Sequence, residues 1–201
     1  MSDSTEPARP LRPGTATDPG AASAKSPGLA TRRYTAFVWL LAAAVLVADQ
    51  LTKVWAVAAL SGGRRVHLLG DWLTLVLVRN PGAAFSFATG QTWIFGLIAI
   101  AVTVAVARMS RRLGSAWWAA ALGLVLGGAV GNLIDRLVRS PGVLRGHVVD
   151  FIDYGGWFVG NIADIAIVVA AVVIMVLSLR GLELDGTRAG AGRGRHAEAE
   201  A

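Results

Sequence analysis

Two aspartates in the C-terminal third of the chain could carry out acid–base chemistry together. Asp150 ends the segment HVVD, and Asp164 stands at the head of a long apolar run. Two neighbouring carboxyl groups cannot both ionise cheaply, so such a pair shares a proton. The ionised group can take a proton from water, while the protonated group polarises a carbonyl and later protonates the leaving amine. This is the chemistry of an aspartic peptidase, and it requires no metal, serine or cysteine.

Further polar residues recur at helical spacing close to the ends of apolar runs. Three sets share this pattern: Asp49 with Lys53, Asn132 with Asp135 and Arg136, and Asn161 with Asp164. Spacings of three and four residues put each set on one face of a helix. Inside a membrane, polar faces turn toward one another or toward water. The sequence therefore predicts that these faces converge.

Each of these residues also has a simpler structural interpretation. Asp164 could cap a helix N-terminus, and Asn132 could form a hydrogen bond between helices. Ion pairing could account for Asp135 with Arg136 and for Asp49 with Lys53. Solvated loops are the simpler interpretation for two other carboxylates, Asp71 and Asp153. Spacing alone does not show that Asp150 and Asp164 lie close together in space.

Composition indicates a helical membrane protein. Of the 201 residues, 54% are hydrophobic and 16% are charged, against about a quarter charged in soluble domains. Apolar runs predict four transmembrane helices at about 36–60, 92–109, 115–138 and 161–180, each near the minimum length for a span. The β-branched and aromatic segment Trp72 to Val78 predicts a small extracytoplasmic β element between the first two helices. We therefore expect an all-α integral membrane fold, a four-helix bundle.

Arginines near the helix ends set the expected orientation. One side of the bundle receives Arg32, Arg33, Arg108, Arg111, Arg112 and Arg180. The positive-inside rule makes this side cytoplasmic, together with both termini. The opposite side also carries arginines, so the bias is modest. The six acidic residues between the tails all map to the outer half or the outer loops.

The two ends of the chain have the composition of disordered tails. Residues 1–34 and 181–201 are rich in Ala, Gly and polar residues and bury too little apolar area to fold. The membrane domain is expected at 35–180. The net charge of +6 is spread over loops and tails without a basic aromatic patch, so no nucleic-acid partner is expected. A signal peptide cleaved near Ala59 is disfavoured, because Asp49 and Lys53 interrupt its apolar core.

Other functions fit the sequence less well. No HExxH motif supports a zinc site, and a Ser–Lys pair of Lys53 with Ser61 or Ser86 lacks a GxSxG elbow. The GGAVG segment at Gly127 to Gly131 resembles a phosphate loop only loosely, and close helix packing is its simpler role. A small transporter or channel would carry polar residues through the whole bilayer depth, whereas the polar residues here lie close to the ends of the apolar runs. A non-catalytic binding scaffold stays open.

Five motifs occur in the order typical of one family: DQLTK, RNPGAAFS, GGAVGNLIDR, GHVVDF and NIAD. Together they make the stretch from about Phe37 to Leu179 similar to lipoprotein signal peptidase, also called signal peptidase II. The resemblance implies a bacterial inner-membrane aspartic endopeptidase, with its active site near the outer leaflet. Such enzymes cut diacylglyceryl-modified prolipoproteins before the lipidated cysteine. Prolipoproteins and membrane lipid are the implied partners, a monomer is expected, and no cofactor or metal is implied.

The resemblance also implies roles for individual residues. Asp150 and Asp164 carry over as the catalytic dyad. Asn161 and Asn132 would position the dyad, whereas Asp135 would be structural. The implied substrate-binding or site-shaping residues are Arg136, Asn80, Asp49 and Lys53. Two positions depart from the family pattern: Ile165 replaces a usual serine, and WFVG precedes Asn161.

Overall fold

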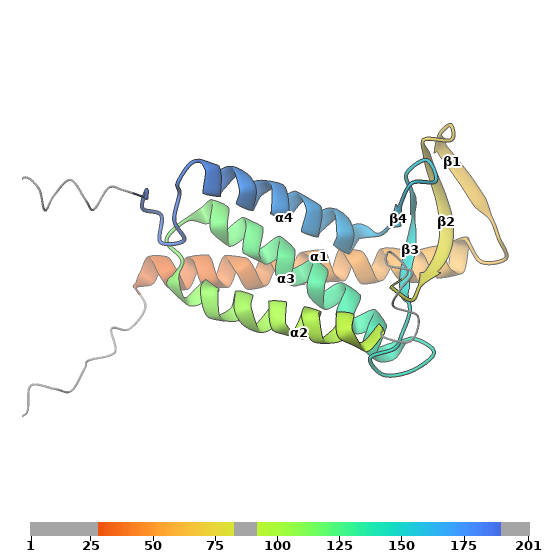
Figure 1. The fold of residues 1–201 in the computed structure, drawn as a ribbon, viewed down its shortest axis with the longest axis horizontal. Helices are drawn as coiled ribbons and strands as arrows, with labels where there is room; N and C mark the ends of the chain where they lie inside the picture. The colour runs from red at the N-terminus through yellow and green to blue at the C-terminus, as the bar shows by residue number, and fades with distance from the viewer. Residues whose placement is uncertain (1–27, 83–91, 190–201) are drawn as a thin grey trace, which may run out of the picture.

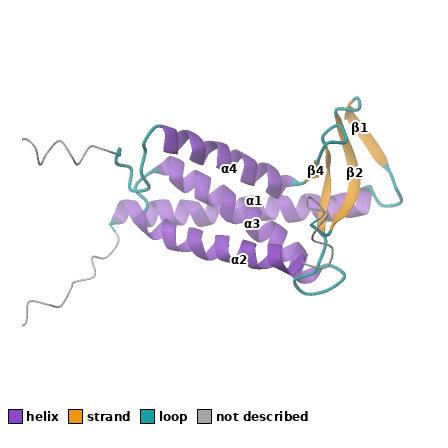
Figure 2. Ribbon diagram, viewed as in Figure 1, coloured by secondary structure: helices purple, strands orange, loops and turns teal. Residues whose placement is uncertain are grey.

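The computed structural model describes residues 28–82 and 92–189. Within these ranges the elements are, in chain order, α1 (Leu29–Ala59), β1 (Arg65–Leu69), β2 (Leu73–Asn80), α2 (Thr92–Met109), the 3-10 helix η2 (Ser110–Arg112), α3 (Ala116–Val138), β3 (Val148–Asp153), β4 (Val159–Gly160) and α4 (Ile162–Leu179). The α-helices lie side by side in a bundle, and the sheet stands across one end of it (Figure 1). Both ends of the described chain lie at the other end of the bundle (Figure 2).

Three helices among the described residues are long and apolar enough to cross a membrane. They are α1, α3 and α4, with mean hydropathies of 1.7, 1.6 and 2.9 over an 18-residue window. Apolar side chains cover much of the outer surface of the bundle, as Leu40, Leu51 and Val168 illustrate. A lipid environment accounts for this surface, because soluble monomers rarely expose such large apolar patches. The prediction of a helical membrane protein with a small β element agrees with this architecture.

Glycines allow α3 to pack tightly between its neighbours. A Cβ at Gly127 would lie 2.7 Å from the carbonyl oxygen of Ala42 in α1. One at Gly128 would lie 2.6 Å from the carbonyl oxygen of Ala163 in α4. Neither contact is sterically possible, so the backbones approach this closely only because these positions lack a side chain. The packing interpretation of the GGAVG segment is confirmed.

The sheet is antiparallel, with strand order β1-β2-β3-β4. The sequence indicated a β element only between the first two helices, yet β3 and β4 come from the connection between α3 and α4. That prediction was incomplete because VVDFID was assigned as a motif and not as a strand, despite its β-branched residues. Val149 and Phe151 of β3 pack with Ala56 of α1 and with Leu60, the C-cap of α1, so the sheet is attached to the bundle by its own small core.

The predicted tail boundaries need correction at both ends. Helix α1 begins at Leu29, so residues 29–34 are helical and not part of a disordered tail. The start of α1 is held by Thr35, whose hydroxyl donates to the carbonyl of Ser110 at 2.7 Å. At the other end, residues 181–189 form an ordered turn against α3, although composition assigned them to a tail. Residues 1–27 and 190–201 lie outside the described residues.

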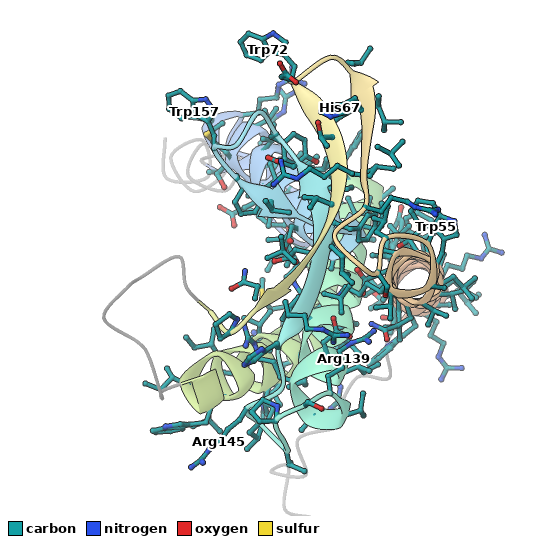
Figure 3. All side chains as sticks on the ribbon, turned by 90° about the vertical axis from the view of Figure 1, so that its right-hand side faces the viewer. Trp55, His67, Trp72, Arg139, Arg145 and Trp157 are labelled. Carbon is teal, nitrogen blue, oxygen red and sulfur yellow. The ribbon has the colours of Figure 1, made fainter. Side chains whose placement is uncertain are left out.

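Figure 3 looks onto the sheet end of the molecule. Trp72 and Trp157 both project outward from the sheet, and their exposed fractions are 82% and 93%. Tryptophan with an apolar ring and a polar N–H suits the boundary between lipid and water. The sheet end of the bundle therefore has the side chains of a membrane interface.

The close packing at Gly128 leads to a test of stability. Gly128→Ala should lower the free energy of unfolding by about 1–3 kcal/mol, because the new methyl group overpacks the contact between α3 and α4. Unfolding in detergent micelles, followed by circular dichroism, measures this change. Gly142→Ala is the matched control, since its Cβ would meet no atom within 4 Å. Equal stability of both variants would contradict the proposed packing.

Candidate active site

A buried lysine lies at the centre of the polar cluster. The side chain of Lys53 has no exposed surface, and its Nζ lies 2.8 Å from Asp49 Oδ2 and 2.9 Å from Asp135 Oδ2. Nζ also donates to Asn132 Oδ1 at 2.9 Å. An ammonium group has three donors and accepts nothing, so these three acceptors satisfy it completely. The predicted pairing of Asp49 with Lys53 is confirmed.

The two carboxylates around Lys53 also hold the surrounding elements together. Asp49 Oδ1 accepts the backbone N–H of Ala163 at 3.0 Å, which joins α1 to the first turn of α4. Asp135 Oδ2 accepts the N–H of Val149 at 3.1 Å, which joins α3 to β3. Arg139 donates to Asp135 Oδ1 at 2.6 Å, so two cations balance the two carboxylates. Asp135 therefore pairs with Lys53 and Arg139, and the charge of Arg136 also acts on it.

Two asparagine amides connect this cluster to Asp150 and Asp164. Asn132 Nδ2 donates to Asp164 Oδ1 at 3.0 Å. Asn161 Nδ2 donates to Asp150 Oδ1 at 2.6 Å and to Asn132 Oδ1 at 3.3 Å. Hydrogen bonds therefore run from Lys53 through Asn132 to Asp164, and from Asn132 through Asn161 to Asp150. The two predicted carboxylates belong to one hydrogen-bonded network.

The N-terminus of α4 fixes Asp164. Asn161 is the N-cap, and its Oδ1 accepts the N–H of Asp164 at 3.1 Å. In return, Asp164 Oδ2 accepts the N–H of Asn161 at 3.0 Å, which completes a capping box. The suggestion that Asp164 is the N-cap is wrong, because Asn161 takes that position and Asp164, the third helical residue, closes the capping box. Its remaining oxygen, Oδ1, faces Asn132.

Strand pairing positions Asp150. Val78 of β2 lies opposite Asp150 of β3, and Asn80 follows two residues later on the same face of its strand. Asn80 Nδ2 consequently reaches Asp150 Oδ2 and donates to it at 2.8 Å. Asn80 Oδ1 accepts the N–H of Gly82 at 2.8 Å, which orients the amide. The rest of the predicted RNPGAAFS motif, from residue 83 on, lies outside the described residues.

The environment of Asp150 favours its protonated form. Only 2% of the residue is exposed. Burial and the nearby charge of Asp164 raise the pKa of Asp150 to about 6, although hydrogen bonds from Asn80 and Asn161 and the charge of Lys53 act in the opposite direction. A pKa near neutrality suits an acid–base group better than the ordinary value of an aspartate.

Arg136 brings a positive charge to the same region. It is 8% exposed, lies in the last turn of α3, and its charge acts on Asp150, Asp135 and Asp164.

Of the carboxylates expected to be solvated, Asp71 has a fully exposed side chain. Asp153 is instead part of β3, where its Oδ1 accepts the N–H of Gly156 at 2.7 Å. No three His, Asp or Glu side chains within residues 28–82 and 92–189 are arranged to hold a metal ion.

Sequence reasoning missed a groove beside Asp164. The groove has a volume of about 370 Å³, and its lining consists of Tyr154, Phe158, Gly160, Asn161, Asp164, Ile165, Val168 and Val169. Tyr154 and Phe158 stack with ring centroids 6.2 Å apart. Ile165 contributes an apolar side chain at the position of the usual serine. Aromatic residues on both sides of a Gly-Gly turn were the signal in the sequence that could have indicated this groove.

Comparison with known proteins identifies the family. The model of the signal peptidase (SPase) II family matches residues 41–180. A lipoprotein signal peptidase from Rhodococcus jostii is 54% identical over 173 residues, covering 86% of each chain. This chain belongs to the signal peptidase II family. The resemblance inferred from the five motifs is confirmed.

Other members of the signal peptidase II family and two solved structures agree. Lipoprotein signal peptidases from Mycolicibacterium smegmatis and Mycobacterium tuberculosis are 50% and 46% identical, covering 92% and 90% of this chain and 76% and 89% of their own. A bacterial membrane enzyme solved at 1.9 Å resolution has a TM-score of 0.63 at 29% identity, covering 71% of this chain and 92% of its own. A second, at 2.3 Å, has a TM-score of 0.61 at 30% identity, covering 71% of this chain and 87% of its own.

The buried lysine provides a test of how this family member is held together. Lys53→Met should lower the apparent unfolding temperature in detergent by about 6–20 °C, because Asp49 and Asp135 would share a buried site without their common cation. Differential scanning fluorimetry measures this shift. The control is His67→Ala, which removes an exposed partner of Asp71 and should change the temperature little. A Lys53→Met protein as stable as the control would show that the cluster is not the anchor of the fold.

Proposed function

We propose that this chain is an intramembrane aspartic endopeptidase. It removes the signal peptide from diacylglyceryl-modified prolipoproteins by cutting before the lipidated cysteine. One observation carries the proposal: in a member of the signal peptidase II family, Asp150 and Asp164 belong to one network in which Asn161 binds both. Chemistry by two carboxylates fits this arrangement.

In the proposed reaction, one carboxylate of the pair is ionised and the other is protonated. The ionised group takes a proton from water, whose oxygen attacks the carbonyl carbon of the scissile bond. The protonated group donates a hydrogen bond to the carbonyl oxygen as negative charge develops there. The carbon–nitrogen bond then breaks, and the amine of the cysteine leaves with a proton from the pair. Asn161 and Asn132 keep both carboxyl groups oriented through these steps.

The groove beside Asp164 supports a substrate with both peptide and lipid parts. Its apolar side chains Ile165, Val168 and Val169 lie on the outer surface of α4, where lipid chains would reach them. Asp164 and Asn161 provide the polar end of the groove. A diacylglycerol anchor in the bilayer would hold the cleavage point at this height, so lipid sets position and orientation. The positive charge of Arg136 and the amide of Asn80 suit contacts to the substrate backbone.

The same proposal includes a membrane topology. Four helices span the bacterial inner membrane, with both termini in the cytoplasm and the sheet on the outer side. Support comes from the basic end of the bundle, which carries Arg32 and Arg33 in α1, Arg108 at the end of α2, Arg111 and Arg112 in η2, and Arg180 after α4. The outward tryptophans of the sheet mark the other interface. The enzyme acts as a monomer.

Removal of either carboxylate tests the proposed reaction. Asp150→Asn and Asp164→Asn should each reduce kcat on a synthetic diacylglyceryl-prolipoprotein by at least about 10³-fold, because neither variant can form the pair that shares a proton. A mass shift of the cleaved lipoprotein measures turnover by the purified protein. Asp71→Asn, at an exposed carboxylate, is the matched control and should keep full activity.

The outcomes distinguish the proposed peptidase from other functions. A transporter or a lipoprotein-binding scaffold would give no cleavage even with the unmodified chain. Near-normal turnover by either aspartate variant would contradict the dyad. Full activity is expected in the presence of EDTA, and its loss would point to a metal site instead.

The hydrogen bond from Asn80 to Asp150 predicts a change in pH dependence. This bond stabilises the ionised carboxylate and so lowers the pKa of Asp150 from the value that burial alone would produce. Asn80→Ala should therefore raise the pKa of Asp150 above about 6. The limb of the kcat/KM profile that reports Asp150 should move to higher pH, whether or not the maximal rate falls. His67→Ala serves as the control, and an unmoved limb in Asn80→Ala would refute the assignment.

A further inference from the structure

A second groove lies at the end of the bundle opposite the two carboxylates. Its volume is about 390 Å³, and its lining consists of Trp117, Val172, Val173, Val176, Leu177, Arg180, Leu182 and Arg188. Arg180, the C-cap of α4, follows Asp164 by 16 positions, which corresponds to roughly 24 Å along the helix. This groove is therefore separate from the proposed active site, and what it binds does not depend on the proposed reaction.

The chain after α4 folds back to build one wall of this groove. Residues 181–189 form a turn closed by two backbone hydrogen bonds, from Ala189 to Gly181 and from Glu183 to Thr187, each 2.8 Å long. Trp118 Nε1 donates to the carbonyl of Leu182 at 2.9 Å, which attaches the turn to α3. The turn returns Arg188 to the end of α4, where it pairs with Leu182 in an isolated bridge.

A glycine makes room for this turn. Gly114 donates its N–H to the carbonyl of Leu184 at 2.9 Å, and a Cβ at Gly114 would collide with the carbonyl of Asp185. Leu182 and Leu184 pack on the same core cluster as Trp118 and Leu177. The groove is thus held by the fold on both sides and is not a gap beside a loose tail.

The charges at the groove are positive and exposed. Neither Arg180 nor Arg188 forms an ion pair with any carboxylate of the described chain. The acidic residues of the turn do not line the groove, and Asp185 accepts hydrogen bonds from the N–H and hydroxyl of Thr187. Two exposed arginines therefore line an apolar groove.

We propose that this groove binds an anionic phospholipid of the leaflet on this side. The valines of α4 would contact an acyl chain, and the two guanidinium groups would bind the headgroup phosphate. Arginine forms forked hydrogen bonds that match phosphate oxygens, and basic residues at the end of a spanning helix attract anionic lipids. Trp117, 66% exposed at the start of α3, is the residue type that favours the headgroup boundary.

The charge of the groove selects among possible lipids. A zwitterionic lipid would bring its own cation toward two arginines, whereas phosphatidylglycerol brings a net negative charge. Under the proposed topology this lipid belongs to the inner leaflet, away from the substrate. The proposal commits to a lipid, because free phosphate would leave the apolar floor of Val172, Val176 and Leu177 uncovered.

Native mass spectrometry of the full-length chain tests the lipid site. Wild-type protein in detergent is titrated with phosphatidylglycerol and with phosphatidylcholine of the same acyl chains. The variant Arg180→Gln/Arg188→Gln should bind phosphatidylglycerol about 25-fold more weakly, about fivefold for each arginine lost. Arg108→Gln/Arg112→Gln is the matched control, since it removes two exposed arginines of the same end that do not line this groove. Both variants should keep wild-type peptidase activity, which shows that they fold.

Two further arms separate the lipid from other ligands. Val176→Phe, which fills the apolar floor but keeps both charges, should also weaken phosphatidylglycerol binding. Inorganic phosphate at millimolar concentration should not compete. Equal loss of binding in both double variants would mean general attraction to a basic surface and would overturn the proposal. So would equal wild-type affinity for the two lipids, or competition by inorganic phosphate.

Discussion

The ammonium group of Lys53 is the constraint on which the arrangement of the site depends. It can only donate, so the Asn132 amide must turn its oxygen toward Nζ, as the 2.9 Å contact shows. The nitrogen of the same amide then faces Asp164, at 3.0 Å. A backbone N–H acts in the same way on Asn161, because the N–H of Asp164 binds its oxygen and leaves its nitrogen for Asp150. The ammonium of Lys53 and the backbone N–H of Asp164 can only donate. They therefore fix which end of each asparagine amide, the oxygen or the nitrogen, faces the carboxyl pair.

Burial of so many charges is tolerated because the cluster is satisfied and neutral. Asp49 and Asp135 are balanced by Lys53 and Arg139, and each carboxylate also accepts a backbone N–H. An incomplete cluster would be costly in this setting, because a buried charge without its partner loses hydration and gains little in return. The backbone groups involved belong to α4 and β3, the two elements that carry Asp164 and Asp150. The carboxylates that balance the buried cations therefore also position Asp150 and Asp164.

Local patterns predicted the helices and the polar faces, and they failed where position depends on distant contacts. The i,i+4 spacing of Asp49 and Lys53 was enough to predict their ion pair, because both groups lie on one helix. Asp135 and Arg139 have the same i,i+4 spacing. No spacing could reveal that Asp135 also binds Lys53 and the N–H of Val149, since these contacts depend on how α1 and β3 pack against α3. β3 itself was missed because a six-residue strand around a charged residue resembles a loop.

The error at the C-terminal end has the same origin. Gly186 and its neighbours have a composition that predicts disorder, yet residues 181–189 are ordered because Trp118 of α3 and Gly114, just before α3, donate hydrogen bonds to them. Composition measures how much apolar area a segment can bury by itself, and it does not include a docking surface provided by another element. Leu182 and Leu184 were the local indication, since two leucines at alternate positions give such a segment something to bury.

The structural and chemical interpretations of Asp164 are compatible, because its two oxygens face different partners. Oδ2 completes the capping box with the N–H of Asn161, which needs only an acceptor. Oδ1 faces the side-chain amide of Asn132 and lies on the network that leads to Asp150. An asparagine at position 164 keeps an acceptor for the cap but can neither ionise nor share a proton. Helix capping alone would let that substitution pass with little effect, so the isosteric change separates the role of Asp164 in holding α4 from its role in hydrolysis.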